Sequence, residues 1–411
     1  MRIFAKLFIT LYLLDGAISL IDELCSRADL AFFTEARYLT AFLVLLLALM
    51  LYVMLFIDAR LKKRIFVPLI LFVWWCALGL WPIPLGENQS TITLLASVVQ
   101  LTLGIGAVAL LRGGSERLLL PQEDFQQPSF RWRSSLSFFA IHLCLLPFAA
   151  VYIGMAYANI MIQQQTSGFM RLSPRGLYMQ DRSYHRNDTM VRLVAMMHIG
   201  REDYYQSLAE SIPGQNSIIL AEGVSDEQQL LESAFNYEGL AGVFGASSQH
   251  ELQFDANLID LDEVGASQNQ SYSQKPDIAM ADLDISSFDA KTIEFLNVLG
   301  RTLFGQQPLS EGVKEYNAWA ERELTPKRLE IITNDILAKR NAELLRHLAV
   351  AVERYQTVVA PWGALHMPEI EAEVLKQGFV PGESLERLSL DFANLPYASI
   401  VEKLGEVAPT E

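Results

Sequence analysis

The sequence has few cysteines and no excess of positive charge. Its 3 cysteines all lie before residue 165, so the rest of the chain offers neither a disulfide framework nor a cysteine zinc site. The formal net charge is −15, which argues against a nucleic-acid partner because such proteins need a basic face. The sequence also lacks the Rossmann and P-loop glycine patterns, so neither nucleotide-binding signature is present.

Charge divides the 411-residue chain into two halves. Residues 1–164 hold 12 Lys and Arg against 10 Asp and Glu, whereas residues 165–411 hold 20 against 37. Apolar residues make up 51% of the chain and mean hydropathy is +0.22, which is high for a wholly soluble protein. The pattern predicts a membrane-embedded half followed by a strongly acidic domain.

Several apolar runs are long enough to cross a bilayer, which takes about 20 helical residues. The four strongest are residues 39–57, 65–85, 91–111 and 136–160. Residues 3–21 form a weaker fifth candidate, interrupted by Asp15; a membrane helix is expected there rather than a signal peptide, because no clean cleavage site follows. Residues 1–160 are therefore expected to form an α-helical transmembrane bundle of four or five helices.

Basic residues in the links predict how the chain is oriented. Four lie within residues 60–64 and four more between 112 and 133. Because Lys and Arg favour the cytoplasmic side, both links are expected inside. The acidic domain is then expected on the outer, periplasmic side of the cytoplasmic (inner) membrane.

Two polar residues, Asp15 and His142, fall within apolar runs. Ionisable groups inside membranes often mark transport pathways, which would suggest a transporter. The structural alternative places Asp15 near a helix end and has His142 bond to a neighbouring helix.

Two segments of the acidic half share one plan, a strand followed by a small residue, a histidine and a helix. Thr357–Ala360 is a β-branched apolar run, after which Gly363 allows a turn and His366 follows. The earlier segment ends in Ala195-Met-Met-His198. Such a pair predicts an internal duplication that brings both histidines to one edge of a sheet, where open α/β folds bind ligands.

Residues 189–400 alternate strand-like and helical patterns, which predicts an α/β domain with a mainly parallel or mixed sheet. Residues 161–188 before it are expected to be a linker or a hairpin, and residues 401–411 a tail. Glu222 follows another apolar run and can share a site with the histidines. Asp282 and Asp284 are expected to be solvated or capping carboxylates.

These features together resemble the TraB/Tiki family, within the superfamily that also contains erythromycin esterases and ChaN-like proteins. The family has two Gly-x-x-His motifs, a glutamate after the second strand and an Arg-Asn pair before the last motif. The last motif is intact as Gly363-Ala-Leu-His366, the glutamate matches Glu222, and the pair matches Arg340-Asn341. The resemblance covers about residues 189–380.

The first motif departs from the family pattern, since Ala195 stands where glycine is expected. Alanine lacks the conformational freedom of glycine, so a tight loop there is expected to differ, although His198 is kept. What the resemblance implies is a metal-dependent hydrolytic site. The reaction is not set by the family, because Tiki proteins are regarded as metalloproteases, ChaN-like members as haem or iron binders, and TraB members are implicated in handling peptide pheromones.

Imidazole and carboxylate groups suit divalent metals, so His198, Glu222 and His366 are the candidate ligands of Mn, Co or Zn. A bound metal lowers the pKa of its water to about 7. Glu222 and His366 are also candidate acid–base groups, and Arg340 is a candidate for stabilising an oxyanion. Glu202 and Glu369 are candidates for orienting the histidine rings, or are solvated.

Two functions follow. The first is a membrane-anchored, metal-dependent hydrolase, with a peptide or a small molecule as substrate and peptidase activity expected. The alternative is a non-catalytic TraB-like module that binds a peptide or haem, as the loss of glycine at Ala195 suggests. In a purely structural interpretation, the histidines are hydrogen-bonded at helix starts and Arg340 pairs with Glu343. The sequence does not indicate the oligomeric state.

Overall fold

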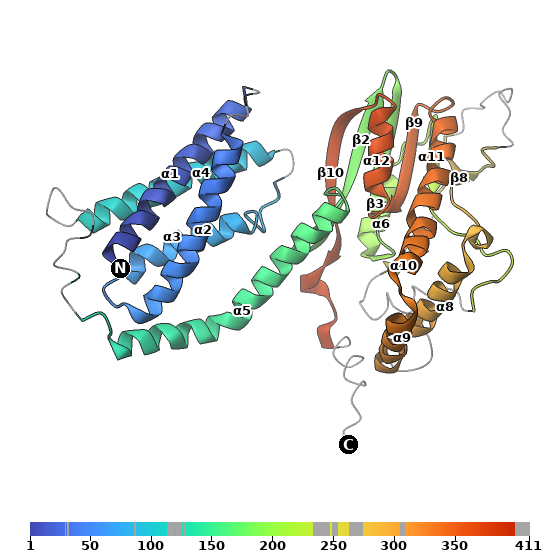
Figure 1. Ribbon diagram of the computed structural model, residues 1–411. Coiled ribbons are helices and arrows are strands. Elements are labelled where there is room, and N and C mark those ends of the chain that lie inside the picture. Colours follow the sequence, from blue (N-terminus) through green and yellow to red (C-terminus); the bar gives the residue numbers. More distant parts are fainter. Residues whose placement is uncertain are drawn as a thin grey trace. The chain divides into compact units, whose positions relative to one another are not determined.

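The chain folds into two compact units, Met1–Ile160 and Met161–Glu411, which are described separately (Figure 1). The structure is a computed structural model. It describes residues 1–28, 30, 33–85, 88–112, 120, 125, 128–232, 247–248, 254–262, 274–304 and 309–398. The expected tail at 401–411 lies outside the described residues.

The first unit is built from helices. They are α1 (Arg2–Ser26), α2 (Thr34–Ile57), α3 (Lys63–Ala77), α4 (Gln89–Arg112) and α5 (Trp132–Gln165). In the described part of the chain, four of them, α1, α2, α4 and α5, are long and apolar enough to cross a membrane. This supports the prediction of a membrane protein with transmembrane helices.

Helix α3 differs from the expected span over residues 65–85. It has 15 residues, which corresponds to about 22 Å at 1.5 Å per residue, short of the roughly 30 Å hydrocarbon core. Gly79 has a φ of +66° and Leu80 of +58°, and this left-handed backbone ends the helix. In contrast, the weak candidate at 3–21 lies within α1, a continuous helix of 25 residues.

The second unit contains a mixed sheet with the strand order β1-β2-β3-β9-β5-β8-β7, with β10 paired to β2. Neighbours from β3 to β7 are parallel, whereas β1, β2, β3 and β10 join one another in antiparallel pairs. The strands are β1 (Met170–Ser173), β2 (Gly176–Arg186), β3 (Thr189–Met196), β5 (Ser217–Ala221), β7 (Asn257–Leu258), β8 (Asp277–Met280), β9 (Thr357–Gly363) and β10 (Val380–Asp391). A mixed sheet was predicted; the internal duplication stays a prediction.

Residues 161–188, expected to be a linker or a hairpin, contain the end of α5 followed by the antiparallel pair β1 and β2. β2 is 11 residues long and joins β3 and β10. The segment is therefore part of the sheet. A further two-stranded sheet pairs β4 (Ile199–Gly200) with β6 (Ser247–Ser248).

The described helices of the second unit are α6 (Glu202–Glu210), α8 (Ala290–Phe304), α9 (Leu309–Glu323), α10 (Pro326–Thr333), α11 (Arg340–Ala351) and α12 (Met367–Lys376). Of these, α6, α11 and α12 supply side chains to the core of the sheet. α11 and α12 lie next to each other (Figure 1). Their apolar faces join the β-branched side chains of β9 and β5 in one buried cluster, as β-branched residues favour. A π-helical segment, Asn334–Lys339, connects α10 to α11.

Candidate functional site

Four neighbouring strands end at one edge of the sheet. In spatial order these are β3, β9, β5 and β8, and all their pairings are parallel. The carboxyl ends of parallel strands meet at the same edge. The residues that follow these ends are His198, His366, Glu222 and Asp282, so the edge gathers two histidines and two carboxylates.

The centre of the site is the guanidinium of Arg340, the first residue of α11. Its Nη2 donates to Oε1 of Glu222 at 2.8 Å and to Oδ2 of Asp282 at 2.6 Å, and its Nε donates to Oδ1 of Asp282 at 2.9 Å. The side chains of Arg340, Glu222 and Asp282 are 12%, 5% and 0% exposed. Burial opposes the charge of Arg340, but its two carboxylate partners outweigh burial and raise its pKa.

Backbone amides complete the coordination of both carboxylates. Oε2 of Glu222 accepts a hydrogen bond from the N–H of Gly363 at 2.7 Å. Asp282 accepts from Gly223 at 3.0 Å and from Leu283 at 2.8 Å. All four carboxylate oxygens therefore have a donor, which offsets much of the cost of burying two charges.

The chain turns after Gly363 as expected, since the N–H of His366 donates to the Gly363 carbonyl at 2.9 Å. This turn does not use left-handed backbone, because the φ of Gly363 is outside that region. A Cβ at this position would lie 3.4 Å from the His366 ring and 3.6 Å from the Glu222 oxygens. These are ordinary contact distances. The position is therefore limited by the space available for a side chain and not by its backbone conformation. The alanine of the earlier motif, Ala195, is fully buried within β3.

Hydrogen bonds determine which nitrogen of His366 carries its proton. Oε2 of Glu369 can only accept, so Asn341 presents its Nδ2 to it, at 2.5 Å. Asn341 must then present Oδ1 to Nδ1 of His366, at 2.6 Å, and that nitrogen must be protonated. Nε2 of His366 is left with a lone pair, 3.4 Å from Nη1 of Arg340 and 3.7 Å from Oε1 of Glu222.

His366 is neutral at pH 7. Burial is the main cause that lowers its pKa to about 4, since the ring is removed from water. The charges of Arg340 and His198 lower the pKa further, whereas those of Glu222 and Asp282 partly oppose the shift. The ring is therefore a hydrogen-bond acceptor at Nε2 over the physiological range.

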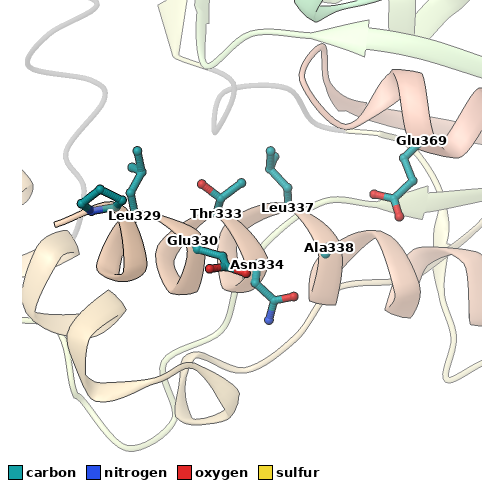
Figure 2. A pocket seen from close by; sticks show the side chains of 8 residues that line it. Leu329, Glu330, Thr333, Asn334, Leu337, Ala338 and Glu369 are labelled. Carbon is teal, nitrogen blue, oxygen red and sulfur yellow. The ribbon is translucent and has the colours of Figure 1, made fainter. Parts of the chain in front are cut away.

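A groove of about 610 Å³ lies along α10 and the π-helical segment (Figure 2). Leu329 and Leu337 supply apolar surface, and Glu330 and Glu369 supply carboxylates. Glu369 stands at one end of the labelled groups in Figure 2 and connects through Asn341 to His366. The groove is therefore lined at Glu369 by the outermost member of the hydrogen-bond chain that orients His366.

The predicted site residues do not all come together. Glu222, Arg340 and His366 form one cluster, as predicted, and His198 is exposed but near enough for its charge to act on His366. Glu202 is exposed and accepts from Gln206 instead of a histidine.

The expectation for Asp282 is wrong, because this side chain is fully buried against Arg340. Its sequence signal is a position two residues after the end of β8, whereas Glu222 directly follows β5, and this position alone does not distinguish a site residue from a cap. Asp284 is a capping residue as predicted, since it accepts from the N–H of Ser286. Arg340 does not pair with Glu343, which instead bonds Arg346.

We tested the fit of this cluster to a divalent metal. The donor types suit one, but Nη2 of Arg340 already lies between Glu222 and Asp282, where a cation bound by both would lie. Within the described residues, no group of three His, Cys, Asp or Glu side chains surrounds a common metal position. This arrangement does not fit a metal while Arg340 holds the carboxylates.

Comparisons with protein-family models, with characterised proteins and with solved structures find no significant match to this chain. The resemblance to the TraB/Tiki family thus stays a prediction that rests on the motif residues.

The protonation of His366 gives a first prediction. In the full chain with ¹³C-labelled histidine, the ring signal that His366→Gln removes should stay at its neutral position down to pH about 5, because its pKa is about 4. NMR in detergent micelles measures this. A midpoint near the ordinary 6.5 would show that the ring is solvated and contradict the described burial.

The ion cluster gives a second prediction. Arg340→Met leaves two buried carboxylates unpaired, so it should destabilise the protein by about 3–5 kcal/mol. Adding Glu222→Gln and Asp282→Asn should restore part of the loss, because the unpaired charges are removed. Calorimetry of the full chain in detergent measures both effects.

Arg346→Met provides the matched control, since Arg346 lies on the same helix but is 46% exposed. This control should leave the unfolding temperature nearly unchanged. If Arg340→Met behaves like the control, the cluster does not hold the sheet edge together.

Proposed function

We propose that the second unit is a membrane-anchored hydrolase, with peptides as its substrate class. One observation carries the proposal. Nη1 of Arg340, the guanidinium nitrogen that bonds neither carboxylate, lies 3.4 Å from the unprotonated Nε2 of His366. A donor that can stabilise an oxyanion therefore stands beside a neutral base, the two groups that amide hydrolysis needs.

In the proposed mechanism, Nε2 of His366 takes a proton from water as the water oxygen attacks the carbonyl carbon. The negative charge that develops on the carbonyl oxygen is stabilised by Nη1 of Arg340. His366 then returns the proton to the leaving nitrogen as the C–N bond breaks. Glu222 and Asp282 position Arg340, and Asn341 holds His366 in the required tautomer.

The divalent metal (Mn, Co or Zn) that the family resemblance implies is not used in this mechanism. A metal would compete with Arg340 for Glu222 and Asp282, so metal dependence remains a separate prediction. It is tested by measuring activity with a chelator and after re-addition of each metal.

A second candidate is a non-catalytic module that binds a peptide or haem. The observation that favours it is the low exposure of the cluster, with every carboxylate oxygen already bonded. Such a module would use the groove beside Glu369 and leave the substrate unchanged.

Activity of the full chain in detergent on fluorogenic peptides separates the two functions. His366→Ala should lower kcat/KM by about 10²–10⁴-fold, the usual contribution of a positioned base. The acid limb of the kcat/KM profile should lie near pH 4, because His366 stays unprotonated down to that pH.

His185→Ala serves as the control, because His185 is an exposed histidine on β2. It should retain full activity. Equal activity of His366→Ala and wild type would refute the hydrolase mechanism, and stoichiometric binding of peptide or haem without turnover would establish the module.

We further propose that the acidic unit lies outside the cytoplasmic membrane. α5 has the length and hydropathy of one crossing, so its two ends lie on opposite sides. The link before it, residues 112–133, contains four arginines, which favour the cytoplasm. The chain after α5 would then be outside. The N–H of Ala59 donates to the carbonyl of Ser129 at 2.7 Å, so the two basic links lie together, and the proposal requires the chain between Lys63 and Arg112 to cross the membrane twice although α3 alone is short.

A cysteine scan tests this orientation. In a chain with Cys25, Cys76 and Cys144 replaced by serine, exposed Glu383→Cys should react with an impermeant maleimide on intact cells. Ser129→Cys, in the link before α5, should react only after lysis. The reverse pattern would place the acidic unit inside.

A further inference from the structure

One face of α1 changes from apolar to polar along the helix. Its buried residues are Ala5, Phe8, Ile9, Tyr12, Asp15, Gly16, Ser19, Asp22 and Glu23. The spacing of three and four residues places them on one side. The first part is an ordinary packing face, and the second is a polar stripe inside a helix of membrane-spanning length.

Asp15 is bound by two neighbouring helices. Thr40 of α2 donates its hydroxyl to Oδ1 at 2.8 Å, and Gln100 of α4 donates its amide to Oδ2 at 2.9 Å and to the carbonyl of Tyr12 at 3.0 Å. The carboxyl lies mid-helix and the residue is 7% exposed, so the alternative that Asp15 lies near a helix end is wrong. Both oxygens of Asp15 are therefore hydrogen-bonded to side chains of neighbouring helices.

The polar stripe carries more negative than positive charge. Asp22 and Glu23 share Arg37, with Nη1 at 3.1 and 2.8 Å from their oxygens. Among the described residues, Arg37 is the cation that is hydrogen-bonded to Asp22 and Glu23. Asp15 is not one of its bonded partners. A buried carboxylate without a bonded cation is costly in a membrane.

The hydroxyl of Tyr12 supplies independent evidence for a missing ligand. Tyr12 is 0% exposed, and within the described part of the chain its hydroxyl has no hydrogen-bond partner. The same hydroxyl interacts electrostatically with Asp15 and with Cys76 of α3. Leaving a buried polar group unsatisfied costs about 1–3 kcal/mol, so a native structure usually supplies a partner such as a water or an ion.

We propose that Asp15, Tyr12 and Thr40 form a site for one small monovalent cation inside the helical unit. Such an ion would neutralise Asp15 and accept coordination from the Tyr12 hydroxyl oxygen, since hard cations prefer oxygen ligands. The groups that face the site are Tyr12 on α1, Arg37 and Thr40 on α2, Cys76 on α3 and Gln100 on α4. The ion is either an alkali cation or a proton, both of which deliver a single positive charge.

The test is the unfolding temperature of the full chain in neutral detergent, in NaCl, KCl or LiCl against choline chloride at equal ionic strength. A cation that binds the folded state stabilises it by mass action. At tenfold excess over its Kd the shift should be about 2–4 °C. Tyr12→Phe should raise the half-saturating concentration several-fold, and Asp15→Asn should abolish the shift.

A pH series in choline chloride distinguishes the proton. If the site takes a proton, stability rises as the pH falls from 8 to 5 in wild type and this rise is absent in Asp15→Asn. Asp58→Asn is the matched control, because Asp58 is a buried carboxylate of the same unit that is paired with Arg60. It should retain the wild-type response to cations and pH.

Two results would overturn the proposal. One is an Asp15→Asn variant that responds to alkali cations and pH as the wild type does. The other is a wild type that responds to neither, and this second measurement decides the matter even if Asp15→Asn fails to accumulate.

Discussion

The ion cluster of Arg340 with Glu222 and Asp282 is the constraint on which the acidic unit depends. It ties the start of α11 to the loops after β5 and β8, and the amide of Gly363 adds the end of β9 to the cluster. Two carboxylates and one guanidinium leave a residual negative charge, yet burial still keeps His366 neutral. The same interaction therefore stabilises the sheet edge and leaves one nitrogen of Arg340 facing a neutral imidazole.

Part of this site could be predicted from the sequence. Glu222 and His366 follow apolar β-branched runs, and the spacing of Arg340-Asn341 before the last motif indicated a shared site. Asp282 could not be identified in this way, because a carboxylate after a strand resembles a cap until the strand order places β8 beside β5. His198 is exposed and His366 is buried. This difference arises from the packing around each histidine, and the spacing of the motif residues gives no information about packing.

In the membrane half, too, the sequence predicts the main elements but not the details of their packing. Apolar runs located the long helices, since composition and length suffice to identify them. The early end of α3 follows from left-handed backbone at Gly79 and Leu80, and a non-glycine residue in that conformation is not evident from an apolar sequence. The partners of Asp15 come from α2 and α4, so they emerge only when the helices are packed.

The position of β9 has a consequence for the order in which the protein is made. Thr357 in β9 pairs with Met190 in β3 and with Ser217 in β5, so the strand that separates these two is synthesised long after both. Contacts so distant in the chain form slowly, because a long loop must close first. The membrane helices all precede residue 166, so a nascent chain can complete its anchor well before the Arg340 cluster exists. A chain interrupted before β9 would keep its membrane segments, Glu222, Asp282 and Arg340, but it would lack His366 and the strand that joins β3 to β5.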